Sequence, residues 1–389
     1  MAEAIEKAGG STASGRKPLW LSWGLIGATV IMLTVMLARL PLSGDFLGYW
    51  SGSALIARGE NAYDSAKLHT LQLATGRGHD FSVNVWNPPW TLVFLLPLGL
   101  LPFAWARALW LVISVLLVAV SGYWLGRAYW PHAGRRGRLA SAILPLLTVQ
   151  VWVTLLQGQI NILVLFGIAG ALFWFSERPG LAGSLLLLAT VKPQIAIGAL
   201  IILALRALVE RRWPFILGAT GAFSLLLVVL TLLRAQWIYD YERVLRTPLL
   251  DYRTPTLATW AREQWPTLPV NALALLLSVL ALFLLAAWTV RTRDWEASVA
   301  SAAVITMLFT LFNWSYDQIV LLVPAYFLLG KVRGKPSIYL SVIAALLLIN
   351  LLVLGIRMAG SIDDFDFFWV APVFAGVYVS ALAWNQRRT

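Results

Sequence analysis

The chain has 389 residues, of which 59% are hydrophobic and only 12% are charged. Soluble domains carry about twice that charged fraction, so the composition excludes a soluble protein and indicates many membrane spans. The net charge is +12, but the basic residues lie in short runs between apolar stretches. Such runs are typical of membrane topology signals, so we expect no nucleic-acid partner.

The reactive residue types are few. There is no cysteine, and the three histidines, His69, His79 and His132, do not have the spacing of metal ligands. No glycine-rich phosphate-binding loop precedes a predicted helix. We therefore expect no cofactor, and no cluster of side chains demands a metal ion.

Apolar segments dominate the chain and predict an all-α, polytopic transmembrane protein with about twelve spans. We interpret residues 1–18 as a flexible cytoplasmic tail and residues 19–389 as a single integral-membrane domain. Several of the segments are shorter than the roughly 20 residues of a span, and for 88–102 and 317–330 tilted, extended or re-entrant forms are open. The segments are 20–40, 88–102, 105–128, 139–156, 159–176, 180–205, 213–233, 270–290, 297–312, 317–330, 336–356 and 367–386.

The basic loops predict the orientation, because Lys and Arg concentrate on the cytoplasmic side of plasma-membrane proteins. Twelve spans place both termini and most basic clusters inside, with the exception of Arg135, Arg136 and Arg138. If 88–102 were re-entrant, that loop would move inside, and a second segment would also fail to span, most plausibly 180–205. We prefer twelve spans. The clusters that agree are Arg16–Lys17, Arg206 with Arg211 and Arg212, Arg291 with Arg293, Lys331 with Arg333 and Lys335, and Arg387–Arg388.

Two long loops, 41–87 and 234–269, face outward in this arrangement, and long loops in a compact protein usually carry function. Asp45 opens the first loop, at the rim of the membrane. Residues 45, 49, 52 and 56 have helical spacing, which predicts a short interfacial helix that begins near Asp45 and contains Tyr49. The carboxylate suits a general base, and a solvated residue at a helix end is the alternative interpretation.

Polar residues beside apolar segments are the next candidates. Asn87 follows Trp86 and precedes two prolines. It belongs either to an interfacial turn or to the lining of a sugar site. Gln157, Gln159 and Asn161 lie at membrane depth, where amides need partners. They fit either a helix–helix hydrogen-bond cluster or the wall of a polar cavity.

A lysine and a carboxylate complete the set. Lys192 lies in the middle of segment 180–205, next to a proline, where an ammonium is costly, so we expect a phosphate or a buried carboxylate as its partner. Trp314 and Asp317 lie in a short outward turn, where Asp317 is either a helix cap or a second active-site carboxylate. Arg58 and Arg253, in the two long loops, are candidates for binding substrate, although most charges of the second loop are expected to pair with one another.

Several of these motifs, in this order and spacing, resemble the integral-membrane glycosyltransferases of the GT-C type, specifically glycosyltransferase family 87. That family includes polyprenol-phosphate-mannose-dependent mannosyltransferases. The resemblance is strongest between residues 40 and about 205. It rests on Asp45 with Tyr49, Gly59-x-x-Ala62-Tyr63, Asn87-Pro88-Pro89, Pro97-Leu98, Leu101-Pro102, Gln157-Gly158-Gln159-Ile160-Asn161 and Lys192-Pro193.

The resemblance implies a GT-C architecture and the transfer of a hexose, most plausibly mannose, from a polyprenyl-phosphate donor to a lipid-linked or glycan hydroxyl. The transfer would take place on the external face, with inversion and with Asp45 as the base. The family often has a histidine in the outer turn, whereas here Tyr316 and Asp317 stand near its place. The alternative function is a transporter or flippase with Lys192 in a midplane site, although the chain has no evident internal repeat.

Overall fold

The computed structural model describes residues 32, 34–40, 44–247, 249–360 and 363–387, and within these ranges it is helical without a β-strand. The predicted tail, 1–18, and most of the first predicted span, 20–40, lie outside the described residues. One cluster of buried apolar side chains extends from Phe46 to Ala381. The prediction of an all-α protein is therefore confirmed for the part of the chain that the structure describes.

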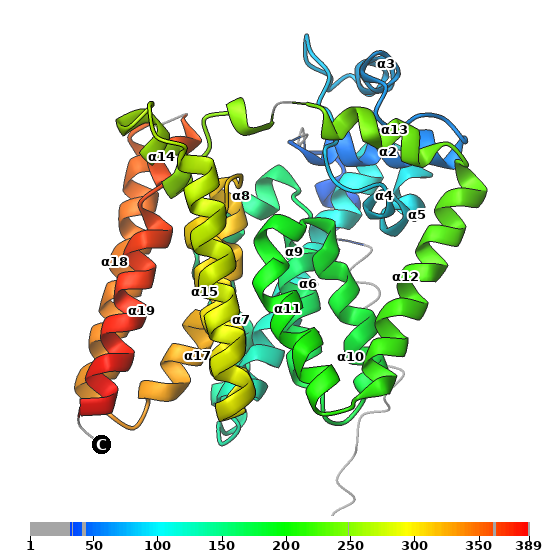
Figure 1. Cartoon of the computed structure of the whole chain (residues 1–389). Helices are drawn as coiled ribbons and strands as arrows, with labels where there is room; N and C mark the ends of the chain where they lie inside the picture. The colour runs from blue at the N-terminus through cyan, green and yellow to red at the C-terminus, as the bar shows by residue number, and fades with distance from the viewer. Residues whose placement is uncertain (1–31, 33, 41–43, 248, 361–362, 388–389) are drawn as a thin grey trace, which may run out of the picture.

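The two long loops fold into short helices that gather at one end of the bundle (Figure 1). The first contains α2 (Phe46–Ala57) and α3 (Ser65–Ala74), and the second contains α13 (Trp237–Leu245), η3 (Leu249–Asp251) and α14 (Leu257–Gln264). The loops meet where Arg234 donates to the carbonyl of Gly59 at 3.2 Å. The helix predicted after Asp45 is confirmed as α2. Residues 46–56 are all buried, however, so α2 is enclosed by the fold and does not lie on a surface.

Long apolar helices form much of the body (Figure 1). Five helices among the described residues are long and apolar enough to cross a membrane, or six if one bent pair is counted as a span. Several expose apolar side chains outward, as membrane helices do; Leu232 is 82% exposed. The membrane prediction is supported, but the count of twelve spans is not confirmed. The long helices are α6 (Phe103–Tyr129), α12 (Trp213–Leu233), α15 (Val270–Thr292), α18 (Pro336–Met358) and α19 (Val370–Arg387), the last preceded by η5 (Asp364–Phe367).

Segment 88–102 does not form a span. It folds into α4 (Trp90–Phe94) and α5 (Leu96–Gly99), of five and four residues. Helices this short reach far less than the roughly 30 Å of a bilayer core. They pack against α2, because a Cβ on Gly99 would lie 2.7 Å from the amide nitrogen of Ala54. The segment therefore does not cross the helical bundle, and its prediction as a full span is not confirmed.

Segment 180–205 turns back on itself at Lys192. It consists of α10 (Pro179–Leu186), η2 (Leu187–Val191) and α11 (Pro193–Val209). The guanidinium of Arg206, near the end of α11, lies 4.0 Å from the ring centroid of Phe175, which precedes α10. Both ends of the segment therefore lie together, and the break that Pro193 enforces lies at the tip of a hairpin.

The basic loop that violated the predicted orientation lies with the other basic loops. A Cβ on Gly330 would meet the carbonyl of Tyr129 at 2.5 Å, so the end of α6 adjoins the Lys331 cluster. Arg135 follows a few residues later. The predicted separation of this loop from the other basic loops is therefore wrong, because 88–102 does not cross the bundle and the following segments run in the opposite direction.

The remaining segments are broken or short helices. Segment 139–156 bends by 64° between α7 with η1 and α8. Segment 317–330 begins as the 3-10 helix η4 and continues as α17. Their polar ends meet at the level of the candidate site. The elements are α7 (Arg135–Ile143), η1 (Leu144–Leu147), α8 (Val149–Gln157), α9 (Asn161–Trp174), α16 (Trp295–Phe309), η4 (Ser315–Leu321) and α17 (Leu322–Val332).

Candidate active site

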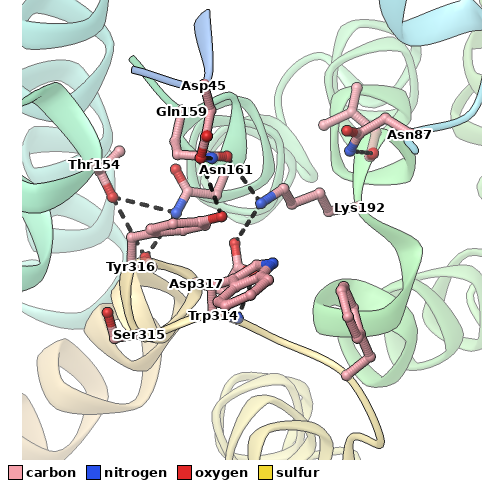
Figure 2. A network of polar contacts seen from close by, with 12 residues as sticks. Asp45, Asn87, Thr154, Gln159, Asn161, Lys192, Trp314, Ser315, Tyr316 and Asp317 are labelled. Atoms are coloured by element: carbon pink, nitrogen blue, oxygen red, sulfur yellow. Dashed lines mark hydrogen bonds and ion pairs between the residues drawn. The ribbon is translucent and has the colours of Figure 1, made fainter. Parts of the chain in front are cut away.

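Asp45 immediately precedes α2, and its carboxylate points toward the turn between α8 and α9 (Figure 2). The Asp45 carboxylate accepts a hydrogen bond from the side-chain amide of Gln159. The residue is only partly buried, although α2 behind it is fully enclosed. A carboxylate in this position is both held in place and accessible to a second molecule.

The amide of Gln159 joins Lys192 with Asp45 and Tyr49, which the sequence placed in different segments. Its nitrogen donates to Asp45, while its oxygen accepts from the hydroxyl of Tyr49 at 3.1 Å and from the ammonium of Lys192 at 3.0 Å. Figure 2 shows the link between Asp45, Gln159 and Lys192. The three donors and acceptors fix the orientation of the amide, so Asp45 and Lys192 lie on opposite ends of one planar group.

Lys192 forms an ion pair with Asp317, with 2.8 Å between Nζ and Oδ1. The side chains are 5% and 1% exposed, so the pair is buried. The other oxygen of Asp317 accepts from the backbone nitrogen of Trp314 at 3.1 Å, and Lys192 lies 4.7 Å from the ring centroid of Tyr316. The expected carboxylate partner of Lys192 is therefore present, in the turn that sequence analysis had considered independently.

Asn161 anchors that turn to the helical bundle. Its side-chain nitrogen donates to the carbonyl of Tyr316 at 2.7 Å and to the hydroxyl of Thr154 at 3.2 Å. The hydroxyl of Tyr316 lies 3.4 Å from Asp45 Oδ2, so it is a second donor toward the carboxylate (Figure 2). The amides predicted at membrane depth thus link helices and also adjoin the charged site, and the two interpretations are compatible.

Two residues that sequence analysis did not select, Trp110 and Arg107, hold the turn that carries Gln159. Gly158 has φ +67°, a conformation that favours glycine. Its carbonyl accepts from the indole of Trp110 at 3.0 Å, and Arg107 donates to the carbonyls of Leu155 and Leu156 at the end of α8. Arg107 was open to detection, because an arginine inside the apolar run 105–128 marks a position with a specific partner.

Asn87 supports the site through the backbone. Its side-chain nitrogen donates to the carbonyl of Val191 at 2.9 Å, and its own carbonyl accepts from the hydroxyl of Tyr63 at 2.8 Å. Val191 directly precedes Lys192, so Asn87 helps to fix the tip of the hairpin. Its side chain is not a member of the Asp45–Gln159–Lys192 network.

Three further predicted site residues lie apart from this network. Gln157 is exposed, on the other side of the Gly158 turn from Gln159. Arg58 is exposed at the C-terminal end of α2, about 20 Å along the helix from Asp45. Arg253 is paired with Glu263 at 2.6 Å and also with Asp363. The expectation that most second-loop charges pair with one another holds for Arg253.

The surroundings tune the acidity of the site. Burial raises the pKa of the Asp45 carboxyl, while the charge of Lys192 and the hydrogen bonds from Gln159 and Tyr316 act in the opposite direction. Burial, with the nearby negative charge of Asp45, holds the pKa of Tyr49 well above its usual range. Tyr49 is therefore a neutral donor at physiological pH, and Asp45 is a carboxylate whose proton affinity is higher than that of a solvated aspartate.

The contacts of these residues suit one class of chemistry. A partly accessible carboxylate and a buried ammonium flank one amide, at the end of a helical membrane protein where two long loops gather. Among the described residues, no group of three or more His, Asp or Glu side chains lies together as metal ligands would. Such an arrangement is chemically suited to acid–base chemistry beside an anionic group.

Comparison with known proteins identifies the family. The model of glycosyltransferase family 87 matches residues 86–313, more than half of the chain, so the protein belongs to that family. It is therefore a glycosyltransferase, as the sequence resemblance predicted, and family membership disfavours the transporter alternative. No curated protein and no solved structure matches the chain. The matched region includes Gln159 and Lys192, whereas Asp317 lies just after it and Asp45 lies well before its first residue, 86.

Proposed function

We propose that the protein transfers a hexose, with mannose as the first candidate, from a polyprenyl-phosphate sugar to a hydroxyl of a lipid-linked or glycan acceptor. The observation that carries this proposal is the Gln159 amide, which holds the Asp45 carboxylate at one end and the Lys192 ammonium at the other. A displacement at a sugar carbon needs a base on the attacking side and a cation near the departing phosphate.

In this mechanism Asp45 takes the proton of the acceptor hydroxyl as its oxygen attacks the anomeric carbon. The bond from that carbon to the phosphate oxygen breaks, and the electron pair leaves with the lipid phosphate. The anomeric configuration inverts in this single displacement. The raised pKa of Asp45 supports its role as the base, because a carboxylate of higher proton affinity accepts the proton of the acceptor hydroxyl more readily.

Lys192 is our candidate for contact with the phosphate. An ammonium has three N–H donors, and the structure describes two acceptors for it, Gln159 and Asp317. The third donor is available for a phosphate oxygen that gains charge as the bond breaks. Asp317 is then the counter-ion of Lys192 and fixes the position of its ammonium inside the protein.

The sugar would lie between these groups, against Tyr49 and Trp314. The hydroxyl of Tyr49 donates to Gln159 and that of Tyr316 to Asp45, so their oxygens can accept from sugar hydroxyls, and Trp314 supplies an aromatic face. A hexose offers hydroxyls and a C–H face for such neighbours. Asn161 and Asn87 support the walls through the backbone contacts described above.

We place the reaction on the external face of the cell membrane, with both termini in the cytoplasm. The positively charged loops, including the Arg135 loop, lie at the end opposite α2 and α3. Segments 88–102 and 180–205 each return to the end of the bundle at which they begin. If the other ten predicted segments each cross the membrane once, the chain has ten crossings. Lysine- and arginine-rich loops mark the cytoplasmic side, which supports an external position for Asp45.

The proposal is tested with purified protein in liposomes, supplied with radiolabelled polyprenyl-phosphate mannose, glucose or galactose and with octyl glycosides or a lipid extract as acceptors. We expect transfer from one donor, with the product anomer opposite to that of the donor. Failure of all donors with every acceptor, or a product of retained configuration, would contradict the proposal. Movement of the donor lipid between leaflets without transfer would instead favour a flippase.

A further inference from the structure

A cavity of about 280 Å³ lies where the two long loops meet. Its walls come from the segment before α3, from the residues before Pro88 and from α13 with the chain that follows it, at the same end as α2 (Figure 1). It is separate from the Asp45–Gln159–Lys192 network, none of whose members lines it. Nothing in the chemistry described above uses this cavity.

The walls combine aromatic faces with polar groups whose charges balance. Trp86 and Tyr252 face each other with ring centroids 4.9 Å apart and planes tilted by 52°, one ring from each loop. Asp240 is neutralised by Arg234 at 2.7 Å. Of the other ionisable lining residues, Asp64 is acidic and Arg243 is basic. A site with aromatic faces and no net charge suits a neutral, hydroxyl-rich ligand better than an anion.

A row of aromatic rings connects this cavity with the catalytic carboxylate. The centroid of Trp86 lies 6.3 Å from that of Phe312, which lies 5.9 Å from Trp314. Trp314 lies 6.5 Å from Tyr316, whose hydroxyl is 3.4 Å from Asp45. The separations are those of neighbouring rings in contact, so the row is continuous from the cavity wall to the base.

We propose that the cavity is a glycan-binding subsite, which holds neutral sugar units of the acceptor while the ring row directs the next hydroxyl toward Asp45. This inference rests on the proposed function, and it specifies the acceptor as a chain of sugars and not a bare lipid alcohol. Tyr252 and Trp86 are its aromatic anchors. Because they belong to different loops, the subsite exists only when the loops are docked.

Binding tests the subsite without catalysis. Neutral mannose, glucose and galactose oligosaccharides of one to four units are titrated into the full-length Asp45→Asn protein in nanodiscs, with saturation-transfer NMR as the readout. We expect tri- or tetrasaccharides of one sugar to bind more tightly than the monosaccharide. Tyr252→Ala should weaken that binding by about tenfold or more, as truncation of an aromatic anchor does. Tyr239→Ala, an exposed α13 residue outside the cavity, is the matched control and should bind normally.

The same pair of variants tests the role in transfer. For acceptors that carry two or more sugars, Tyr252→Ala should raise the acceptor KM and leave kcat nearly unchanged, while Tyr239→Ala should change neither. For an octyl monoglycoside the two variants should match the wild type. Equal oligosaccharide binding by Tyr252→Ala and wild type, or no oligosaccharide binding at all, would overturn the inference. Tyr252-dependent binding without any sugar transfer would keep the subsite and reject the proposed reaction.

Discussion

At the scale of single residues, the properties of Asp45 follow from its neighbours. Burial raises its pKa, and the charge of Lys192 is the largest influence in the opposite direction. A general base works as the carboxylate, so its activity falls as the pH drops through its pKa. We therefore expect the acidic limb of kcat/KM to lie above the pKa of about 3.9 of a solvated aspartate. A rate that stays constant down to that value would argue against Asp45 as the base.

The same reasoning gives a sharper prediction for Lys192. Lys192→Gln removes the positive charge that favours the ionised form of Asp45, so the acidic limb of the remaining activity should move to higher pH. The pH–rate profile of the variant beside that of the wild type measures the shift. An unchanged limb, or one displaced to lower pH, would show that the two groups are not coupled as the network implies.

The ion pair between Lys192 and Asp317 should be coupled in stability. Removing one member leaves the other charged and buried, at a cost of about 3–5 kcal/mol. We expect Lys192→Met to lower the unfolding temperature more than the double variant Lys192→Met, Asp317→Asn does. Thermal unfolding of the wild type, Lys192→Met, Asp317→Asn and the double variant in one detergent measures this coupling. Additive effects would indicate that the pair is not formed.

At the scale of elements, the Gly158 turn sets the position of Gln159. A Cβ at Gly158 would lie 2.6 Å from Cβ of Phe46 and 3.1 Å from Arg107 Cζ, and φ is +67°. Gly76 has nearly the same φ, +68°, with no atom within 4 Å, so it is a matched control. Gly158→Ala should reduce transfer by about tenfold or more, as misplacement of a site by about 1 Å does, whereas Gly76→Ala should retain activity. If Gly158→Ala and Gly76→Ala lost similar amounts of transfer activity, backbone strain alone would explain the loss.

The elements also show what the sequence did and did not reveal. Helical spacing after Asp45 correctly predicted α2, and the mid-segment Lys192-Pro193 correctly marked a break. The enclosure of α2 could not be read locally, because all its faces are covered by segments distant in sequence, such as Val83 beside Gly48. The meeting of Lys192 with Asp317 likewise depends on a hairpin and a turn 125 residues apart.

At the scale of the whole molecule, the all-α fold class and the membrane setting could be predicted from the composition and the apolar segments. The number of crossings could not. Hydropathy reports that a segment is apolar, but it does not tell a span from a buried hairpin such as 180–205. The misplaced Arg135 loop was the signal that favoured the re-entrant alternative. The contact between Gly330 and Tyr129 places that loop at the same end of the bundle as the Lys331 cluster.

The absence of cysteine in the sequence makes the orientation directly testable. His132→Cys, beside the Arg135 loop, should be protected from a membrane-impermeant thiol reagent on intact cells, as Thr292→Cys should be. Leu73→Cys, exposed on α3, should react. Labelling of His132→Cys from outside would restore the twelve-span arrangement and remove the basis for ten crossings.

The most direct test of the central proposal is the rate of sugar transfer by Asp45→Asn in liposomes, with the donor and acceptor that the wild type uses. Asn keeps the shape of the side chain and removes the base, so kcat should fall by about 100-fold or more, with little change in either KM. Asp80→Asn, an exposed residue of the same loop, should transfer at the wild-type rate. Transfer by Asp45→Asn within a few-fold of the wild type would contradict the assignment of Asp45 as the catalytic base.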